Sequence, residues 1–225
     1  MISQQENMER KLIILDGIIG AGKTKLWNDL KEIYKNRKIL FVEEDDYSEI
    51  TLMGKKYDPL AECYHTENKN DRIVTSQMII INKSSEKILN ALLNEGNYEV
   101  IIFDRWHLSC SSFINAKFYN KELSEFTKDF LLNYLEKYDI AISKYSGLKP
   151  QNCTVFILDT PLPTSLERIS KRERKQEMGV SEDYWCALNT ALRESYNNYD
   201  RRFNYIFLDT QEKIKNKIEE ILQHK

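Results

Sequence analysis

The sequence predicts an α/β protein in which a parallel β-sheet lies between two layers of helices. Its short apolar runs are continuous rather than alternating, as in strands that are covered on both faces. Five such runs occur along the chain, at residues 12–15, 39–42, 100–103, 154–158 and 205–208. Helical patterns separate them, which favours a parallel sheet in a three-layer sandwich. A length of 225 residues favours one domain, residues 1–225.

The helices expected between these strands show their apolar faces in the sequence. Leu26 and Leu30 share one helical face after the first run, and Ile214 and Ile218 share another near the end of the chain. Ser181 is followed by two acidic residues, which is typical of the start of a helix. Each of these helices has one apolar side, so we expect it to cover a face of the sheet.

One long polar segment, residues 45–71, follows the second predicted strand. Because it contains Gly54 and Pro59, it is predicted to be loop-rich with short helical pieces. In an α/β sheet, ligands bind beyond the carboxyl ends of the strands. Most of the charged motifs described next follow such an end, so we expect them to lie together.

Composition excludes several classes of protein. The net charge is −2, so no overall basic field attracts nucleic acid. The four cysteines form no CxxC pair, so neither a zinc knuckle nor a disulfide framework is indicated. Residues 1–10 are polar and predicted to be flexible, and no apolar run is long enough to cross a membrane. We therefore expect a cytoplasmic protein with free thiols.

The first strand is followed by a glycine-rich motif of the form G-x-x-x-x-G-K-[ST]. It consists of Gly17, Ile18, Ile19, Gly20, Ala21, Gly22, Lys23 and Thr24. Small residues let backbone N–H groups point at a polyphosphate, and the start of the next helix adds a positive partial charge. Lys23 can reach the β- and γ-phosphates, and the Thr24 hydroxyl can ligate Mg²⁺. The strand–loop–helix context predicts binding of ATP with Mg²⁺ rather than a chance glycine-rich turn.

Charged residues follow two other predicted strands. Asp104 ends the third strand, where a carboxylate can hold Mg²⁺, and Arg105 beside it can stabilise a transferring phosphate. Glu43 and Glu44 follow the second strand, and a carboxylate there can take a proton from an attacking hydroxyl. A strand-end salt bridge and a solvated acidic turn are the alternatives. We take Glu43 as the base, although the sequence distinguishes it only weakly from Glu44 in this role.

A basic segment follows the fourth predicted strand. Four of its residues are expected on one helical face: Arg168, Lys171, Arg172 and Lys175. Such a face is often only solvated, but mobile arginines that close over a transferring phosphoryl group are a known mechanism. We therefore predict an arginine-rich lid over about residues 168–180, to which Arg174 also belongs. Nucleic-acid binding by this segment is the weaker alternative, because the rest of the chain lacks a matching basic and aromatic surface.

In this order, the motifs resemble those of the deoxynucleoside kinase family, which is related to the thymidylate kinases. The resemblance covers residues 12–208 and rests on the phosphate loop, the acid after the second strand and the Asp104–Arg105 pair. It also rests on the lid, whose residues Arg172, Arg174 and Glu177 have the spacing of that family. The resemblance implies a P-loop kinase fold with a five-stranded parallel sheet.

The resemblance further assigns roles to individual residues. It implies that Glu43 is the general base, that Gln77 hydrogen-bonds the base of the nucleoside, and that Glu177 binds the sugar 3′-hydroxyl. Tyr64 is expected as a second contact to the sugar. The implied activity is transfer of the γ-phosphate of ATP to the 5′-hydroxyl of a deoxynucleoside. The expected partners are these small molecules, and a homodimer is the expected assembly if the chain self-associates.

The sequence also departs from the family. Proline often follows the catalytic glutamate there, and an aromatic residue comes soon after, whereas this chain continues with acids to Tyr47, which can take over the aromatic role. Asp104 and Arg105 are followed by Trp106, which is more similar to thymidylate kinases, so a nucleoside monophosphate kinase is the main alternative. A nucleotide-binding switch is less favoured, because Asn82-Lys83-Ser84-Ser85 lacks the aspartate of a GTPase base-reading motif.

Overall fold

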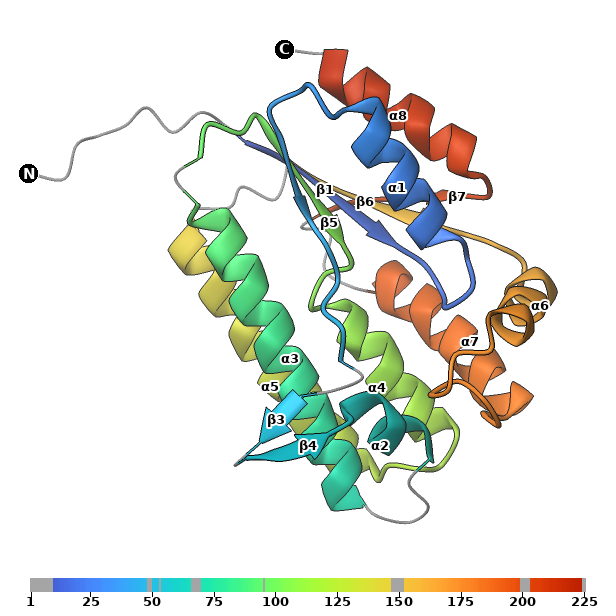
Figure 1. Ribbon diagram of the computed structural model, residues 1–225. Coiled ribbons are helices and arrows are strands. Elements are labelled where there is room, and N and C mark those ends of the chain that lie inside the picture. The colour runs from blue at the N-terminus through green and yellow to red at the C-terminus, as the bar shows by residue number, and fades with distance from the viewer. Residues whose placement is uncertain are drawn as a thin grey trace, which may run out of the picture.

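The protein is built around a five-stranded parallel sheet, as Figure 1 shows for the computed structural model. The structure describes residues 10–47, 50–52, 54–65, 70–94, 96–146, 152–198 and 203–223. The predicted flexibility of residues 1–10 lies almost wholly outside these ranges. The strand order is β2-β5-β1-β6-β7, and each neighbouring pair is parallel. The predicted α/β class and five-stranded sheet are therefore confirmed.

All five strands lie where the apolar runs predicted them. Their bounds are Lys11–Asp16 for β1, Ile39–Val42 for β2, Val100–Asp104 for β5, Cys153–Leu158 for β6 and Asn204–Leu208 for β7. The three central strands are almost fully buried, whereas β2 and β7 at the edges are half-buried. Continuous apolar runs thus mark the strands that are covered on both faces.

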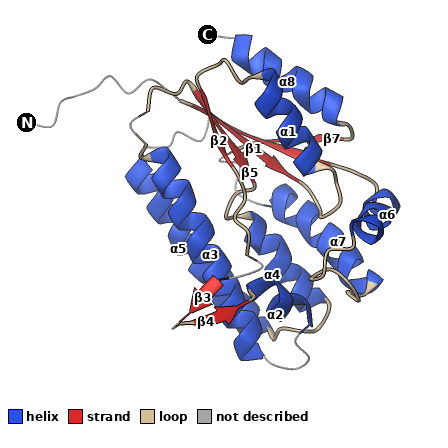
Figure 2. Ribbon diagram, viewed as in Figure 1, coloured by secondary structure: helices blue, strands red, loops and turns tan. Residues whose placement is uncertain are grey.

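The two faces of the sheet carry different helices (Figure 2). Helices α1 (Lys23–Ile33) and α8 (Gln211–Gln223) cover one face. The other face is covered by α3 (Asn70–Leu92), α4 (Ser109–Tyr119), α5 (Glu125–Ser146) and α7 (Glu182–Asn198). Alternate residues of β1 enter the two cores: Leu12 and Ile14 pack toward α3, α4 and α5, and Ile13 and Leu15 toward α1 and α8.

The polar segment after β2 contains more regular structure than the sequence predicted. A short antiparallel hairpin joins β3 (Ile50–Leu52) to β4 (Lys55–Tyr57), and helix α2 (Pro59–His65) follows. The turn contains Gly54 at a φ of 76°, in the left-handed region that glycine adopts easily. Strands of three residues are too short to show a hydrophobic period, so no sequence pattern predicted them.

Helix α6 (Leu162–Arg172) leads into the predicted lid. The helix ends at Glu173, whose φ of 50° is left-handed, so the expectation that Lys175 shares a helical face with Arg168 is wrong. The next helix begins as predicted, because the Ser181 hydroxyl accepts a hydrogen bond of 3.2 Å from the Tyr184 N–H. Within the described residues, no helix is both long and apolar enough to cross a membrane.

Candidate active site

The glycine-rich motif forms the connection between β1 and α1. Lys23 opens the helix, and its Nζ donates hydrogen bonds to the carbonyl oxygens of Gly17 at 3.0 Å and Ile18 at 3.3 Å. Gly22 precedes the helix at a φ of 105°, and Thr24 is exposed at its first turn. The motif therefore has the closed loop and helix N-terminus that cradle phosphates.

Two glycines of this loop are required by close packing. A Cβ atom on Gly20, whose φ is 80°, would lie 2.5 Å from the carbonyl oxygen of Ser165. A Cβ atom on Gly17 would lie 2.8 Å from the carbonyl oxygen of Leu158. Backbone atoms cannot move aside as flexible side chains can, so the loop holds its shape only with glycine here.

Lys23 is buried, and its environment changes its acidity. The pKa of Lys23 is lowered to about 8 by burial and by the nearby charge of Arg105, while Asp16 and Asp104 act in the opposite direction. The desolvation of the ammonium group is the largest cause. The negative charge of a bound polyphosphate would offset this desolvation and favour the protonated lysine.

Arg105 lies at the centre of the site, just beyond β5. Its φ of 66° is unusual for a residue with a side chain, and its N–H donates to the carbonyl oxygen of Leu15 at 3.0 Å. Its Nη1 donates to Asp16 at 2.7 Å and its Nε to Glu44 at 3.2 Å. The guanidinium group also lies over the ring of Phe113, 5.5 Å from its centroid. These contacts fix the direction of its remaining donors.

Asp16 is a site residue that the sequence reasoning missed. It is fully buried at the end of β1, and besides Arg105 it accepts hydrogen bonds from the Gly17 N–H at 2.7 Å and the Ser109 hydroxyl at 2.5 Å. The Tyr196 hydroxyl on α7 is a further donor. The sequence could have identified Asp16 as a site residue, because it ends the first apolar run at the same edge of the sheet as Asp104.

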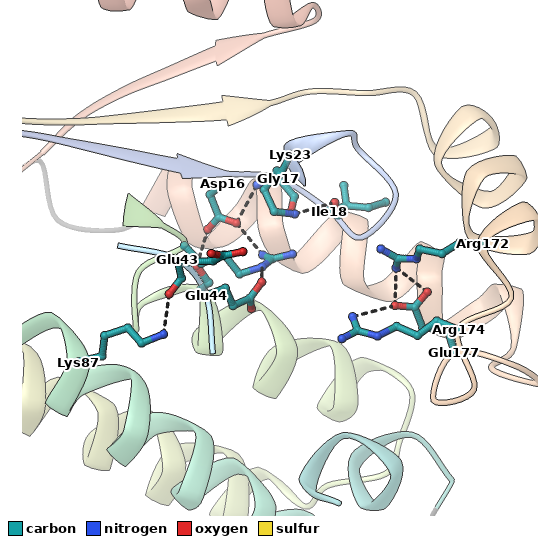
Figure 3. A network of polar contacts seen from close by, with 12 residues as sticks. Asp16, Gly17, Ile18, Lys23, Glu43, Glu44, Lys87, Arg172, Arg174 and Glu177 are labelled. Carbon is teal, nitrogen blue, oxygen red and sulfur yellow. Dashed lines mark hydrogen bonds and ion pairs between the residues drawn. The ribbon is translucent and has the colours of Figure 1, made fainter. Parts of the chain in front are cut away.

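Glu43 and Glu44 take different positions (Figure 3). The side chain of Glu43 is 68% exposed, and its carboxylate lies 3.8 Å from the Lys31 ammonium group. The Glu44 carboxylate instead lies against the Arg105 guanidinium group. Lys87 on α3 holds this segment from the other side by donating to the Glu43 carbonyl oxygen at 2.5 Å and by pairing with Asp45. The geometry therefore brings Glu44, rather than Glu43, to Arg105.

Asp104 has the features of a cation ligand. Burial raises the pKa of Asp104, while Lys23 opposes the shift. Its Oδ1 is buried and has no hydrogen-bond partner among the described residues. A buried carboxylate oxygen without a partner is costly, and Mg²⁺ prefers oxygen ligands of this kind. Asp104 and the Thr24 hydroxyl across the loop are therefore a donor set that fits Mg²⁺.

The lid lies next to the phosphate loop. Arg168 on α6 donates from Nη1 to the carbonyl oxygens of Gly20 at 3.2 Å and Ala21 at 2.8 Å. Farther along, Arg172 binds the Glu177 carboxylate through two hydrogen bonds, and Arg174 lies 3.7 Å from the same group (Figure 3). The Glu177 side chain is only 3% exposed. The structure thus brings the predicted lid residues together.

A cavity of about 550 Å³ connects the phosphate loop with the polar segment after β2. Its lining includes the loop, Glu44, Asp104, Arg105, the lid arginines, Glu177 and the predicted nucleoside contacts Tyr47, Tyr64 and Gln77. Gln77 is buried, and its Nε2 donates to the Cys63 Sγ at 3.4 Å. Burial raises the pKa of Tyr47 and of Tyr64, so both remain neutral phenols. One cavity therefore contains both halves of the predicted site.

The sequence model of the deoxynucleoside kinase family matches residues 13–225. The chain belongs to the deoxynucleoside kinase family. It is accordingly an ATP-dependent kinase of deoxynucleosides.

Individual proteins with sequence similarity are more distant. A thymidylate kinase from Prochlorococcus marinus strain NATL2A is 25% identical over 232 residues, which cover 97% of this chain and 100% of that protein. A probable thymidylate kinase from Sulfurisphaera tokodaii is 24% identical over 216 residues, which cover 95% and 94%. These similarities extend over the full kinase domain.

Solved structures share the fold. A deoxyadenosine kinase from M. mycoides with bound dCTP superposes with a TM-score of 0.66 at 22% identity, over 93% of this chain and 99% of that one. The same enzyme with bound dATP gives a TM-score of 0.66 at 23% identity, over 94% and 97%. The P-loop kinase fold expected from the motifs is therefore confirmed.

Proposed function

We propose that this deoxynucleoside kinase phosphorylates the 5′-hydroxyl of its acceptor and discriminates against nucleoside monophosphates. The observation that carries this proposal is the charge balance around Arg105. Three carboxylates, those of Asp16, Glu44 and Asp104, lie near this guanidinium group, and two of them bind it directly. An acceptor phosphate would add negative charge beside them, at a substantial Coulombic cost. A neutral hydroxyl adds none, which disfavours the thymidylate-kinase alternative.

Glu44 is the base in this proposal, in place of Glu43. Its carboxylate lies against Arg105 and lines the same cavity as Asp104, which supports placing the acceptor oxygen beside it. A general base must reach the proton that it abstracts. Arg105 orients the Glu44 carboxylate through their ion pair, and Asp16 keeps Arg105 in place. The Glu43 side chain is exposed and pairs with Lys31.

The donor phosphates are held by the loop and the lid. Lys23 leaves the two carbonyl oxygens of its own loop and binds the phosphates, while Arg168, Arg172 and Arg174 stabilise the charge that spreads over the transferring group. Thr24 and Asp104 would hold Mg²⁺. The metal ion supplies further neutralisation of phosphate charge when it is bound.

The acceptor is positioned by the other half of the cavity. We assign Gln77 to the base, because its amide offers a donor and an acceptor side by side. Glu177 and Tyr64 are assigned to the sugar, and Tyr47 to the wall beside the base. The structures of the M. mycoides deoxyadenosine kinase with bound dATP and dCTP support deoxyadenosine and deoxycytidine as the first acceptors to test.

The decisive experiment compares kcat/KM for all four deoxynucleosides with the values for their monophosphates, with ATP and Mg²⁺ as donor. We expect at least one deoxynucleoside to exceed its monophosphate by more than tenfold. A wide preference for thymidine monophosphate would replace the proposal with a thymidylate kinase. ATP turnover that needs no acceptor would favour a nucleotide-binding switch.

We also propose a cytoplasmic role in nucleotide salvage and a homodimeric assembly. All four cysteines are free thiols, as expected in a reducing compartment. One face of α5 exposes Phe126, Phe130 and Ile140 to 83%, 46% and 54%, which supports burial against a second copy. Analytical ultracentrifugation of the wild type and of Phe126→Glu tests the assembly, because a charge in that face should favour the monomer.

A further inference from the structure

Lys117 is a charged residue that lies buried on α4, outside the groups assigned to phosphate transfer. It is 1% exposed. Its Nζ lies 2.5 Å from a Glu122 carboxylate oxygen, 4.4 Å from the ring centroid of Tyr184 and 5.9 Å from that of Tyr64. The ammonium group is thus enclosed by one anion and two aromatic rings.

A buried lysine is rare, because removing an ammonium group from water is energetically costly unless partners replace the water. Here the partners are fixed. The Glu122 carboxylate also accepts a hydrogen bond of 2.5 Å from the Asn120 side chain, and the Glu122 N–H donates to the Lys117 carbonyl oxygen at 2.8 Å. The faces of the aromatic rings offer further negative potential. The chain therefore maintains this charge in a place where an apolar side chain would pack more simply.

The two rings come from elements that form the wall of the cavity. Tyr64 lies on α2 and Tyr184 on α7, and both line the cavity. Their ring centroids are 5.8 Å apart, and Tyr64 also lies 5.9 Å from Trp185. Lys117 thus connects α2, α4 and α7 at one point.

Helix α2 is also held by α3, where the Gln77 side chain donates to the Cys63 Sγ at 3.4 Å and Arg72 pairs with Glu62 at 3.2 Å. It is short, and it touches the lid through hydrogen bonds of His65 with the Gln176 carbonyl oxygen at 2.9 Å and of the Gln176 side chain with Asp58 at 3.0 Å. These lid contacts must change if the lid moves. The contact with Lys117 lies on α4, which packs in the core and does not belong to the lid.

We propose that Lys117 is a positioning residue for the acceptor, which holds the Tyr64 ring against the sugar side of the cavity whether the lid is open or closed. It lies outside the cavity lining and acts on the acceptor through the Tyr64 ring. The proposal rests on the assignment of Tyr64 to the acceptor half of the site. Loss of the Lys117 ammonium group should therefore weaken acceptor binding and leave ATP binding unchanged.

The test replaces Lys117 with methionine, which keeps the length of the side chain and removes the charge. Lys128 provides a matched control, because its Nζ lies 4.4 Å from the Phe118 ring centroid and 3.2 Å from Asp129, and neither Lys128 nor Phe118 lines the cavity. We expect Lys117→Met to raise KM for the acceptor about tenfold, the order expected for loss of a desolvated cation–π contact. KM for ATP should stay within twofold. Lys128→Met should change neither constant more than twofold.

A second set of variants distinguishes positioning from general damage. In a Tyr64→Leu background, Lys117→Met should add less than twofold, because the ring through which it acts is gone. Glu122→Gln removes the anion and leaves the lysine, and it should raise KM for the acceptor about threefold even if Lys117→Met does not fold. An equal loss for ATP and acceptor, an undiminished effect in Tyr64→Leu, or an unchanged acceptor KM in Glu122→Gln would each overturn the proposal.

The same measurements separate this inference from the proposed function. The acceptor preference of the wild type alone decides between a deoxynucleoside and a monophosphate. The ratio of the acceptor KM of Lys117→Met to that of the wild type is then measured with whichever acceptor the wild type uses.

Discussion

Replacement of Glu44 by glutamine should nearly stop phosphoryl transfer, whereas the same replacement at Glu43 should leave it almost intact. The two residues are adjacent and chemically identical, so they are matched controls for each other. Glu44 lies on Arg105 at 3.2 Å, while Glu43 is 68% exposed and lies 3.8 Å from Lys31. Of the two, Glu44 therefore lies beside Arg105, where we propose that the acceptor oxygen binds.

The magnitude follows from these positions. A general base contributes on the order of 10²–10⁴-fold, which is about 2.7–5.4 kcal/mol of barrier at about 1.36 kcal/mol for each factor of ten. Arg105 keeps its contact with Asp16 in Glu44→Gln, so the variant should fold. Glu43→Gln loses one exposed ion pair, which is worth about 0–1 kcal/mol of stability and nothing in the transition state.

The assay measures steady-state ADP release at saturating ATP and acceptor, with ATP binding to each variant measured separately by calorimetry. We expect kcat to fall at least a hundredfold in Glu44→Gln, with ATP affinity within threefold of wild type. Glu43→Gln should stay within twofold in both. A hundredfold loss in Glu43→Gln, with Glu44→Gln active, would refute the assignment and return the role to Glu43.

Three further predictions address the loop and the lid. Because burial lowers the pKa of Lys23 to about 8 and only the ammonium form attracts phosphate, ATP affinity should be flat below pH 8 and fall above it. The slope should be at most about tenfold per pH unit, and Lys23→Met should abolish it in the same calorimetric titration. Glu177→Ala should raise KM for the deoxynucleoside, and a 3′-deoxy acceptor should be penalised less by the variant than by the wild type, as initial rates would show. Gly20→Ala should lower the melting temperature more than Gly179→Ala. Both glycines have φ near 80°, but only a Cβ atom at Gly20 would clash with Ser165. Equal losses would mean that backbone strain alone, and not the clash, sets the loss of stability.

The sheet and the phosphate loop could be predicted because their signals are local. A run such as that of β1 is apolar without interruption because it is buried on both faces, and the loop motif needs its glycines for reasons of backbone shape. The hairpin of β3 and β4 could not be predicted, because three-residue strands carry no period.

The charged site was harder to predict, because it depends on the direction in which side chains point. Glu43 and Glu44 both follow β2, and adjacent residues in an extended chain face opposite ways, so an error of one residue exchanges their roles. The partners of Lys117 lie on three elements that are distant in sequence. No pattern within α4 marks that lysine as buried.

The ion pair between Arg172 and Glu177 has a thermodynamic consequence. In the proposed roles, one member serves the phosphates of ATP and the other serves the sugar, yet here they bind each other. Whichever substrate binds first separates the pair and leaves the second partner available to the other substrate. The free-energy cost of separating the pair then falls on the first substrate to bind and not on the second. ATP should therefore tighten the binding of the acceptor, and the acceptor should tighten the binding of ATP by the same factor.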